Sequence, residues 1–330
     1  MDGLYLLWWV QEKQMSPALV AATMAAGDLA LMALEVPTGW FADRFGSRRS
    51  LILGSLLQVA GMICCWLATG VAGLVGACLL VALADAFRSG ADHSLLYRSC
   101  AALGREGEFQ RIEARARAIQ VVVLALLTVG GGAIVTTFGF AAGWIAETLL
   151  CALGGVVALA MIEPPASEDE SDEHAASTRA KAPWRAIALL IVPLAFLDAA
   201  ASTGSFLLQT TGDRGPLAVT LVVAMIALAD AAGSALATRL PETGVRMQMA
   251  IAAIGSVLVA AALTIPGALV PTTIVLSFGT GTLHPLRASA IQRLASDGVR
   301  ARAASAASAC DMALSTLFLL LAGTWLSRRK

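Results

Sequence analysis

The chain has 330 residues, of which 58% are hydrophobic and only 14% are charged, and its 23 basic residues balance its 23 acidic ones. A soluble protein of this length would need polar faces on its helices, so this composition excludes the soluble classes. Apolar runs recur from end to end at intervals of about one helix and one turn. This pattern indicates an all-α integral membrane protein.

Ten apolar runs are long enough to cross a bilayer as helices, which takes about 20 residues each. They lie near residues 17–38, 50–69, 72–97, 113–137, 141–162, 184–208, 216–239, 247–266, 270–291 and 302–327. A shorter run, 3-GLYLLWWV-10, precedes them and resembles the second half of a helix whose beginning is missing. We therefore expect ten full spans after a partial first helix.

One segment is clearly polar: 163-EPPASEDESDEHAASTRAKAPWR-185 has prolines, a dense acidic run and then basic residues. Such composition is typical of a solvated linker, and a solubilising tether is favoured over a regulatory role. The expected division is an N-terminal bundle, a linker and a C-terminal bundle, at residues 1–162, 163–183 and 184–330. Lys and Arg concentrate in alternate loops, which predicts that these loops and the linker face the cytoplasm. The basic tail 328-RRK-330 falls on the opposite side, so a twelfth helix is expected to be missing after it.

The two halves around the linker also resemble each other, as in transporters built by duplication. At an offset of 191 residues, four identities relate them: Gly90 with Gly281, His93 with His284, Arg111 with Arg302 and Gly132 with Gly323. Both sets run from one span through a basic loop into the next span. The sequence therefore predicts two pseudo-symmetric helical bundles.

The most specific motif lies between the first two full spans, in 39-GWFADRFGSRRS-50. Its fixed positions, in the pattern G-x-x-x-D-R-x-G-x-R-R, are Gly39, Asp43, Arg44, Gly46, Arg48 and Arg49. The motif resembles the signature loop of the major facilitator superfamily, which joins the second and third helices of those secondary transporters. Gly39 would permit a close approach between helices, and Gly46 would permit a tight turn. The arginines would hold the loop at the anionic cytoplasmic face of the membrane.

The resemblance also implies a role for Asp43. In the family this carboxylate sits against the amino end of the eleventh helix, which here would lie near residues 303–308. Such a contact exists only while the cytoplasmic side is closed, so Asp43 would act as a conformational latch. The alternative is a plain basic loop that fixes the topology.

Two further segments extend the resemblance and depart from it. With 35-EVPTG-39, the segment 89-SGADHSLLYRS-99 is similar to a bacterial branch of the superfamily, but Arg98 stands where that branch has an Asp. Glu113 or the acidic linker would have to replace that acid. The glycine-rich 128-TVGGGAIVT-136 lacks the Gly-Pro step of drug–proton antiporters, so helix packing is its favoured role.

Ionisable side chains within spans are costly to bury and are therefore candidates for function. The predicted substrate or proton cavity comprises Asp28, Asp85, Arg88, Asp92, Asp198, Gln209, Asp230 and Asp311. The spacing of Asp85 and Asp92 places both acids beside Arg88 on one helix face, either as an anion-binding group or as a structural ion pair.

Asp198 is followed by polar residues that make one side of its helix polar, namely Ser202, Thr203, Ser205 and Gln209. Such a side suits either the wall of a cavity or hydrogen bonding between helices. Asp28, Asp230 and Asp311 are each the lone acid of their helix segment and are candidates for proton coupling. His93 and His284, at repeat-equivalent positions, are interpreted as solvated interfacial side chains, and the alternative is a proton relay. The six cysteines show no metal-binding spacing, so packing explains them.

We expect a secondary active transporter that moves a small organic solute or drug across the cytoplasmic membrane by alternating access, coupled to protons. The alternative is a truncated or degenerate membrane protein without transport activity, such as a sensor or subunit. No Walker loop, H-E-x-x-H or G-x-S-x-G motif indicates an enzyme. The expected partners are a small-molecule substrate, protons and membrane lipid. No cofactor, metal or nucleic acid is expected, and the protein is expected to be a monomer.

Overall fold

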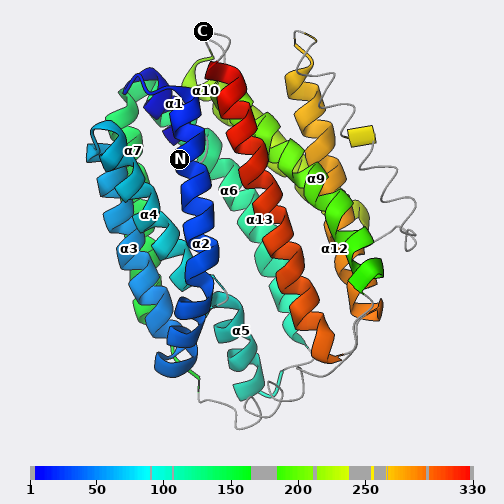
Figure 1. The fold of residues 1–330 in the computed structure, drawn as a ribbon. Coiled ribbons are helices and arrows are strands. Elements are labelled where there is room, and N and C mark those ends of the chain that lie inside the picture. Colours follow the sequence, from blue (N-terminus) through cyan, green and yellow to red (C-terminus); the bar gives the residue numbers. More distant parts are fainter. Residues whose placement is uncertain are drawn as a thin grey trace.

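The chain folds into long helices that run roughly alongside one another (Figure 1). This computed structural model describes residues 4–89, 91–105, 108–164, 184–210, 214–237, 254–255, 265, 267–294 and 297–327. The first helices are α1 (Leu4–Gln11), α2 (Pro17–Phe45), α3 (Ser47–Leu67), α4 (Gly70–Arg88), α5 (Ala91–Ala102), α6 (Phe109–Phe138) and α7 (Phe140–Ala160). The C-terminal half contributes α9 (Trp184–Thr210), α10 (Pro216–Ala237), α12 (Leu269–Leu294) and α13 (Asp297–Ser327).

Within the described residues, eight helices are long and apolar enough to cross a membrane, judged by length and composition. They are all or part of α2, α3, α4, α6, α7, α9, α10 and α13. The expected span 270–291 does form the long helix α12, but this helix is too polar to count among the eight. The expected span 247–266 lies almost entirely outside the described residues.

The expectation of one continuous span over 72–97 is wrong. Helix α4 ends at Arg88, and Ser89 leaves the helical region with a ψ of 121°, before α5 begins at Ala91. The sequence at this break is Ser-Gly, and glycine is among the weakest helix formers. Figure 1 shows α5 as a separate short helix at one end of the molecule.

Single glycines join two of the helix pairs. Gly46 alone connects α2 to α3 with a φ of +96°, and Gly139 alone connects α6 to α7 with a φ of +83°. Residues with a side chain rarely adopt this backbone conformation, whereas glycine adopts it freely. The tight turn predicted at Gly46 is therefore confirmed.

The two halves meet where α2 packs against α13 and α6 packs against α10, and Figure 1 shows α2 and α13 side by side. A Cβ atom built on Gly132 of α6 would lie 1.9 Å from the Thr220 hydroxyl of α10. One built on Gly323 of α13 would lie 2.9 Å from the Ala21 Cβ of α2. These two glycines are repeat-equivalent, so the same small residue permits both close contacts between the pseudo-symmetric bundles.

Helix α1 packs against both halves. Its Trp8 makes edge-to-face contacts with Trp9 and with Trp144 of α7, at centroid distances of 5.1 and 5.2 Å. The same apolar cluster includes Phe206 of α9 and Leu319 of α13. The short apolar run at the start of the sequence is thus a helix that packs where the two halves meet.

Candidate functional site

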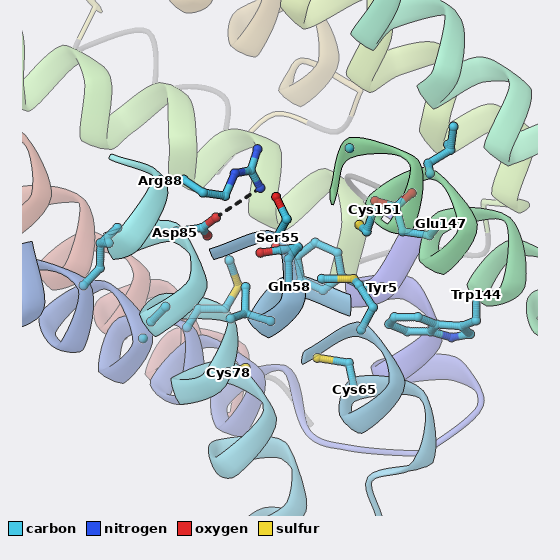
Figure 2. A pocket seen from close by; sticks show the side chains of 18 of the residues that line it. Tyr5, Ser55, Gln58, Cys65, Cys78, Asp85, Arg88, Trp144, Glu147 and Cys151 are labelled. Atoms are coloured by element: carbon cyan, nitrogen blue, oxygen red, sulfur yellow. Dashed lines mark ion pairs between the residues drawn. The ribbon is translucent and has the colours of Figure 1, made fainter. Parts of the chain in front are cut away.

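One cavity lies within the N-terminal half and is called the N-half cavity here. It has a volume of about 720 Å³ and is lined from helices α1 to α7. Figure 2 shows part of its lining, including the Asp85–Arg88 ion pair. Its charged and amide-bearing side chains are Asp28, Gln58, Asp85, Arg88, Asp92 and Glu147.

Four of the predicted candidates therefore gather in the N-half cavity. Arg88 lies 3.8 Å from Asp85, and both side chains are about half exposed. Because the helix breaks after Ser89, the expected single helix face bearing Arg88 and Asp92 does not exist. Asp92 instead enters the same cavity from the first turn of α5.

A second cavity, the interface cavity, has a volume of about 470 Å³ and is lined by both halves of the chain. Tyr5 and Leu6 of α1 and Met24 of α2 line it from the N-terminal side. Helices α9, α10 and α12 contribute its other polar residues, which are Asp198, Ser202, Ser205, Gln209, Asp230, Ser277 and Thr280.

The predicted polar side of α9 faces this interface cavity. Asp198, Ser202, Ser205 and Gln209 all line it, whereas Thr203 is buried elsewhere. The side-chain amide of Gln209 donates to the Ser205 hydroxyl at 3.0 Å, and the Thr280 hydroxyl lies 3.5 Å from the Asp230 carboxylate. Ser277 and Thr280 were missed in the sequence because hydroxyl residues are common in spans.

A network of charged side chains adjoins the interface cavity. His284 Nε2 lies 3.6 Å from the Asp198 carboxylate, and its Nδ1 lies 3.2 Å from the Arg287 guanidinium. Arg287 is 8% exposed and donates to both carboxylate oxygens of Asp311, at 2.9 and 2.8 Å. The network links α9, α12 and α13.

Two expectations change as a result. Asp311 is the lone acid of its helix segment, yet it lines neither cavity described here and forms a buried ion pair instead. The interpretation of His284 as merely solvated is incomplete, because its side chain is 37% exposed but also contacts two charged partners. The side chain of His93 lies outside the described residues.

A third polar cluster forms at the start of α3, beside the signature motif. The Glu163 carboxylate accepts hydrogen bonds from the backbone N–H groups of Ser47 and Arg48, at 3.1 and 2.6 Å. It also pairs with Arg98 at 2.6 Å, and Arg98 donates to the Ser47 hydroxyl at 2.7 Å. A carboxylate here satisfies free helix donors and interacts favourably with the helix dipole.

Glu163 thus supplies an acidic partner near the position where Arg98 replaces the Asp of the bacterial branch. It is the first residue of the predicted linker, one of the two alternatives drawn from the sequence. The side chain of the other, Glu113, lies outside the described residues. The only signal in the sequence was an acid directly after the end of an apolar run.

The signature motif itself is mostly helical. Gly39, Asp43 and Arg44 belong to α2, while Arg48 and Arg49 lie in the first turn of α3. A Cβ atom on Gly39 would meet no described atom within 4 Å, so the close approach at Gly39 stays a prediction.

The arginines of the motif make local contacts. Arg48 donates to the Leu159 carbonyl at the end of α7, at 2.7 Å. The guanidinium of Arg44 lies 5.7 Å from the centre of the Trp40 ring, within cation–π range. The Asp43 side chain lies outside the described residues, so the latch stays a prediction.

Comparison with known proteins agrees with this architecture. A variant of the nucleoside transporter NupG superposes with a TM-score of 0.71 at 14% identity, covering 97% of this chain and 84% of that one. A bacterial homologue of the human lysosomal transporter Spinster, inward-facing and unoccupied, gives 0.69 at 14% identity, covering 96% and 77%. A D-xylose–proton symporter gives 0.66 at 13% identity, covering 97% and 83%.

At such identities these likenesses concern the fold alone. The family model of the Major Facilitator Superfamily, by contrast, matches the sequence itself over residues 3–319. That match includes the signature motif, both halves and the linker between them. The chain is therefore a multi-span helical membrane protein that belongs to the Major Facilitator Superfamily.

Proposed function

We propose that the protein is a secondary active transporter that moves a small organic solute across the membrane by alternating access. The observation that carries this proposal is the interface cavity, because both halves of the chain line it and the C-terminal half supplies most of its polar groups. A solute bound there would contact α1 and α2 on one side and α9, α10 and α12 on the other. Rocking of the halves about the α2–α13 and α6–α10 contacts would expose it alternately to each side.

Protons are the proposed driving ion. Asp198 and Asp230 line the interface cavity, and His284 lies beside Asp198, so titratable groups are placed where a solute would bind. A similar fold occurs in a D-xylose–proton symporter. The buried Arg287–Asp311 pair holds α12 and α13 together beside this group.

The remaining parts of the proposal concern placement and gating. The protein resides in the cytoplasmic membrane as a monomer, with bundles at 1–162 and 184–330 and a cytoplasmic linker at 163–183. Asp43 latches the closed cytoplasmic side, where the Glu163 cluster already holds the start of α3.

Flux measurements in reconstituted vesicles test the proposal. A panel of labelled solutes is offered under an imposed pH gradient to the native protein, to Asp43→Asn and to Glu35→Gln. Glu35 is an exposed acid two turns earlier in α2 and serves as the matched control. Gradient-driven flux that falls only in Asp43→Asn supports both the transporter and the latch.

A second measurement does not depend on knowing the solute. Spin labels at two exposed positions, Leu103 just after α5 and Trp184 at the start of α9, report the separation of the halves on the side predicted to be cytoplasmic. Two distance populations whose ratio changes in Asp43→Asn are expected. A single fixed distance together with no flux from folded protein would favour a non-transporting member of the family.

A further inference from the structure

We propose that the interface cavity selects an elongated organic cation, with an ammonium group at one end and a second hydrogen-bond donor at the other. This inference rests on the proposed transport function, because it names the class of solute that the same cavity holds. Three features of the cavity carry it: the charge of its lining, an unsatisfied acceptor in its wall, and the distance between the two.

The charged groups of the described lining are all acidic. Asp198 and Asp230 line the cavity from α9 and α10, and the described lining contains no Lys or Arg. The guanidinium of Arg287, which lies beside His284, is already matched by the bidentate carboxylate of Asp311. Carboxylates that line a low-dielectric cavity favour a cation over a neutral or anionic solute.

His284 leaves this preference intact. Its Nδ1 faces the Arg287 guanidinium, which can only donate, so Nδ1 is the acceptor in this contact and Nε2 carries the ring hydrogen. Nε2 then points its hydrogen toward Asp198. The Arg287 guanidinium therefore pairs with Asp311 and contacts His284, and no guanidinium contact with Asp198 is among the described interactions.

Gln209 supplies the second feature. The residue is 8% exposed, its Nε2 donates to Ser205, and its Oε1 has no hydrogen-bond partner among the described residues. A buried carbonyl oxygen without a partner is unfavourable unless a ligand or water donates to it. Because Gln209 lines the interface cavity, a solute N–H or O–H is the donor that fits.

Helix geometry sets the distance between the two ends. Asp198 and Gln209 lie on one face of α9, separated by eleven residues or about 16 Å along the axis. This rise separates the backbone positions, and the Gln209 amide folds back toward Ser205. A hydrogen bond of about 3 Å at each end therefore leaves up to about 10 Å between the two donors of the solute. Ser202 and Ser205 line the path between them, and Leu6, Phe206 and Leu319 offer apolar contact to the solute body.

Calorimetric titration of the native protein in lipid nanodiscs tests the inference with three probes that share the same straight octane chain. These are diaminooctane with an amine at each end, octylamine with one amine, and octanediol with none. We expect diaminooctane to bind at least tenfold more tightly than octylamine, and octanediol to bind no better than to empty nanodiscs. Octanediol binding as tightly as diaminooctane would overturn the charge argument without any variant.

Substitutions assign the two ends. Asp198→Asn or Asp230→Asn should weaken both amines at least tenfold, whereas Gln209→Leu should reduce diaminooctane to the affinity of octylamine and leave octylamine unchanged. Gln120→Leu, at an exposed position of α6, is the matched control and should change neither. Amine binding that none of the cavity substitutions alters would place the amines elsewhere and refute the inference.

Flux of the same probes separates this inference from the proposed function. Amine binding with the expected variant pattern but no flux would support the cation site and count against transport. Flux of neutral or anionic solutes, with no binding or flux of the amines, would support transport and overturn the cation inference.

Discussion

The close contact between α6 and α10 leads to a prediction about three adjacent glycines. Gly130, Gly131 and Gly132 occupy the middle of α6, but only Gly132 faces Thr220 of α10. A Cβ atom at Gly132 would lie 1.9 Å from the Thr220 hydroxyl oxygen and 2.9 Å from its Cβ, whereas one at Gly130 would meet nothing described within 4 Å. Gly130→Ala and Gly132→Ala therefore add the same methyl group to the same helix, and they differ mainly in whether that group meets α10.

The expected magnitudes follow from two opposing effects. Replacing a mid-helix glycine with alanine gains about 0.5–1 kcal/mol of helix propensity at either position. At position 132 the added methyl group overpacks the contact, which costs about 1–3 kcal/mol. Thr220 cannot easily turn aside, because it is fully buried and its hydroxyl already bonds the carbonyls of Pro216 and Leu217. The difference between the two variants isolates the overpacking cost, since the propensity gain is common to both.

Equilibrium unfolding in mixed micelles with increasing SDS measures both variants against the native protein. We expect Gly130→Ala to be slightly more stable than the native protein and Gly132→Ala to be less stable by about 1–2 kcal/mol. Adding Thr220→Ala should recover much of the loss, because it removes the hydroxyl that lies nearest. Equal stability of Gly130→Ala and Gly132→Ala would refute the close contact between the two halves.

Two further predictions concern the charged clusters and use the same unfolding assay. Glu163→Ala removes the acceptor of three hydrogen bonds and should lower the free energy of unfolding by about 2–3 kcal/mol. Glu163→Gln keeps an acceptor and should cost about half as much. Equal losses of stability in the two variants would argue against a role for the charge. Asp311→Asn leaves the buried Arg287 without its counter-charge and should cost about 3–5 kcal/mol. The paired replacement of Arg287 with Met and Asp311 with Leu should cost clearly less than the two single changes together, and strict additivity would contradict the pairing.

Local features of the sequence were sufficient for the architecture and the family. A segment that crosses hydrocarbon must satisfy its own backbone hydrogen bonds, so run length and apolar content predict helices without reference to the rest of the chain. The signature motif is local as well, since its fixed positions lie within eleven consecutive residues, and the turn at Gly46 follows from glycine alone. One local signal was misread, because the Ser-Gly step that ends α4 lies within an otherwise continuous apolar run.

The grouping of the candidate residues depended on the tertiary structure. The sequence identified Asp28, Asp85, Arg88 and Asp92 as well as Asp198, Gln209 and Asp230, but only the structure divides them between the N-half cavity and the interface cavity. It also pairs Arg287 with Asp311 across two helices, and brings Glu163 to the start of α3, more than a hundred residues away in the chain.

The sequence could not predict this grouping because lipid, rather than water, surrounds the helices. In a soluble protein, an apolar stripe shows which face of a helix is buried, because water covers the opposite face. In a membrane, lipid and the protein interior are both apolar, so composition says little about the rotation of each helix about its axis. That rotation decides whether Asp311 enters a cavity or meets Arg287, and it is determined only when the helices pack against one another.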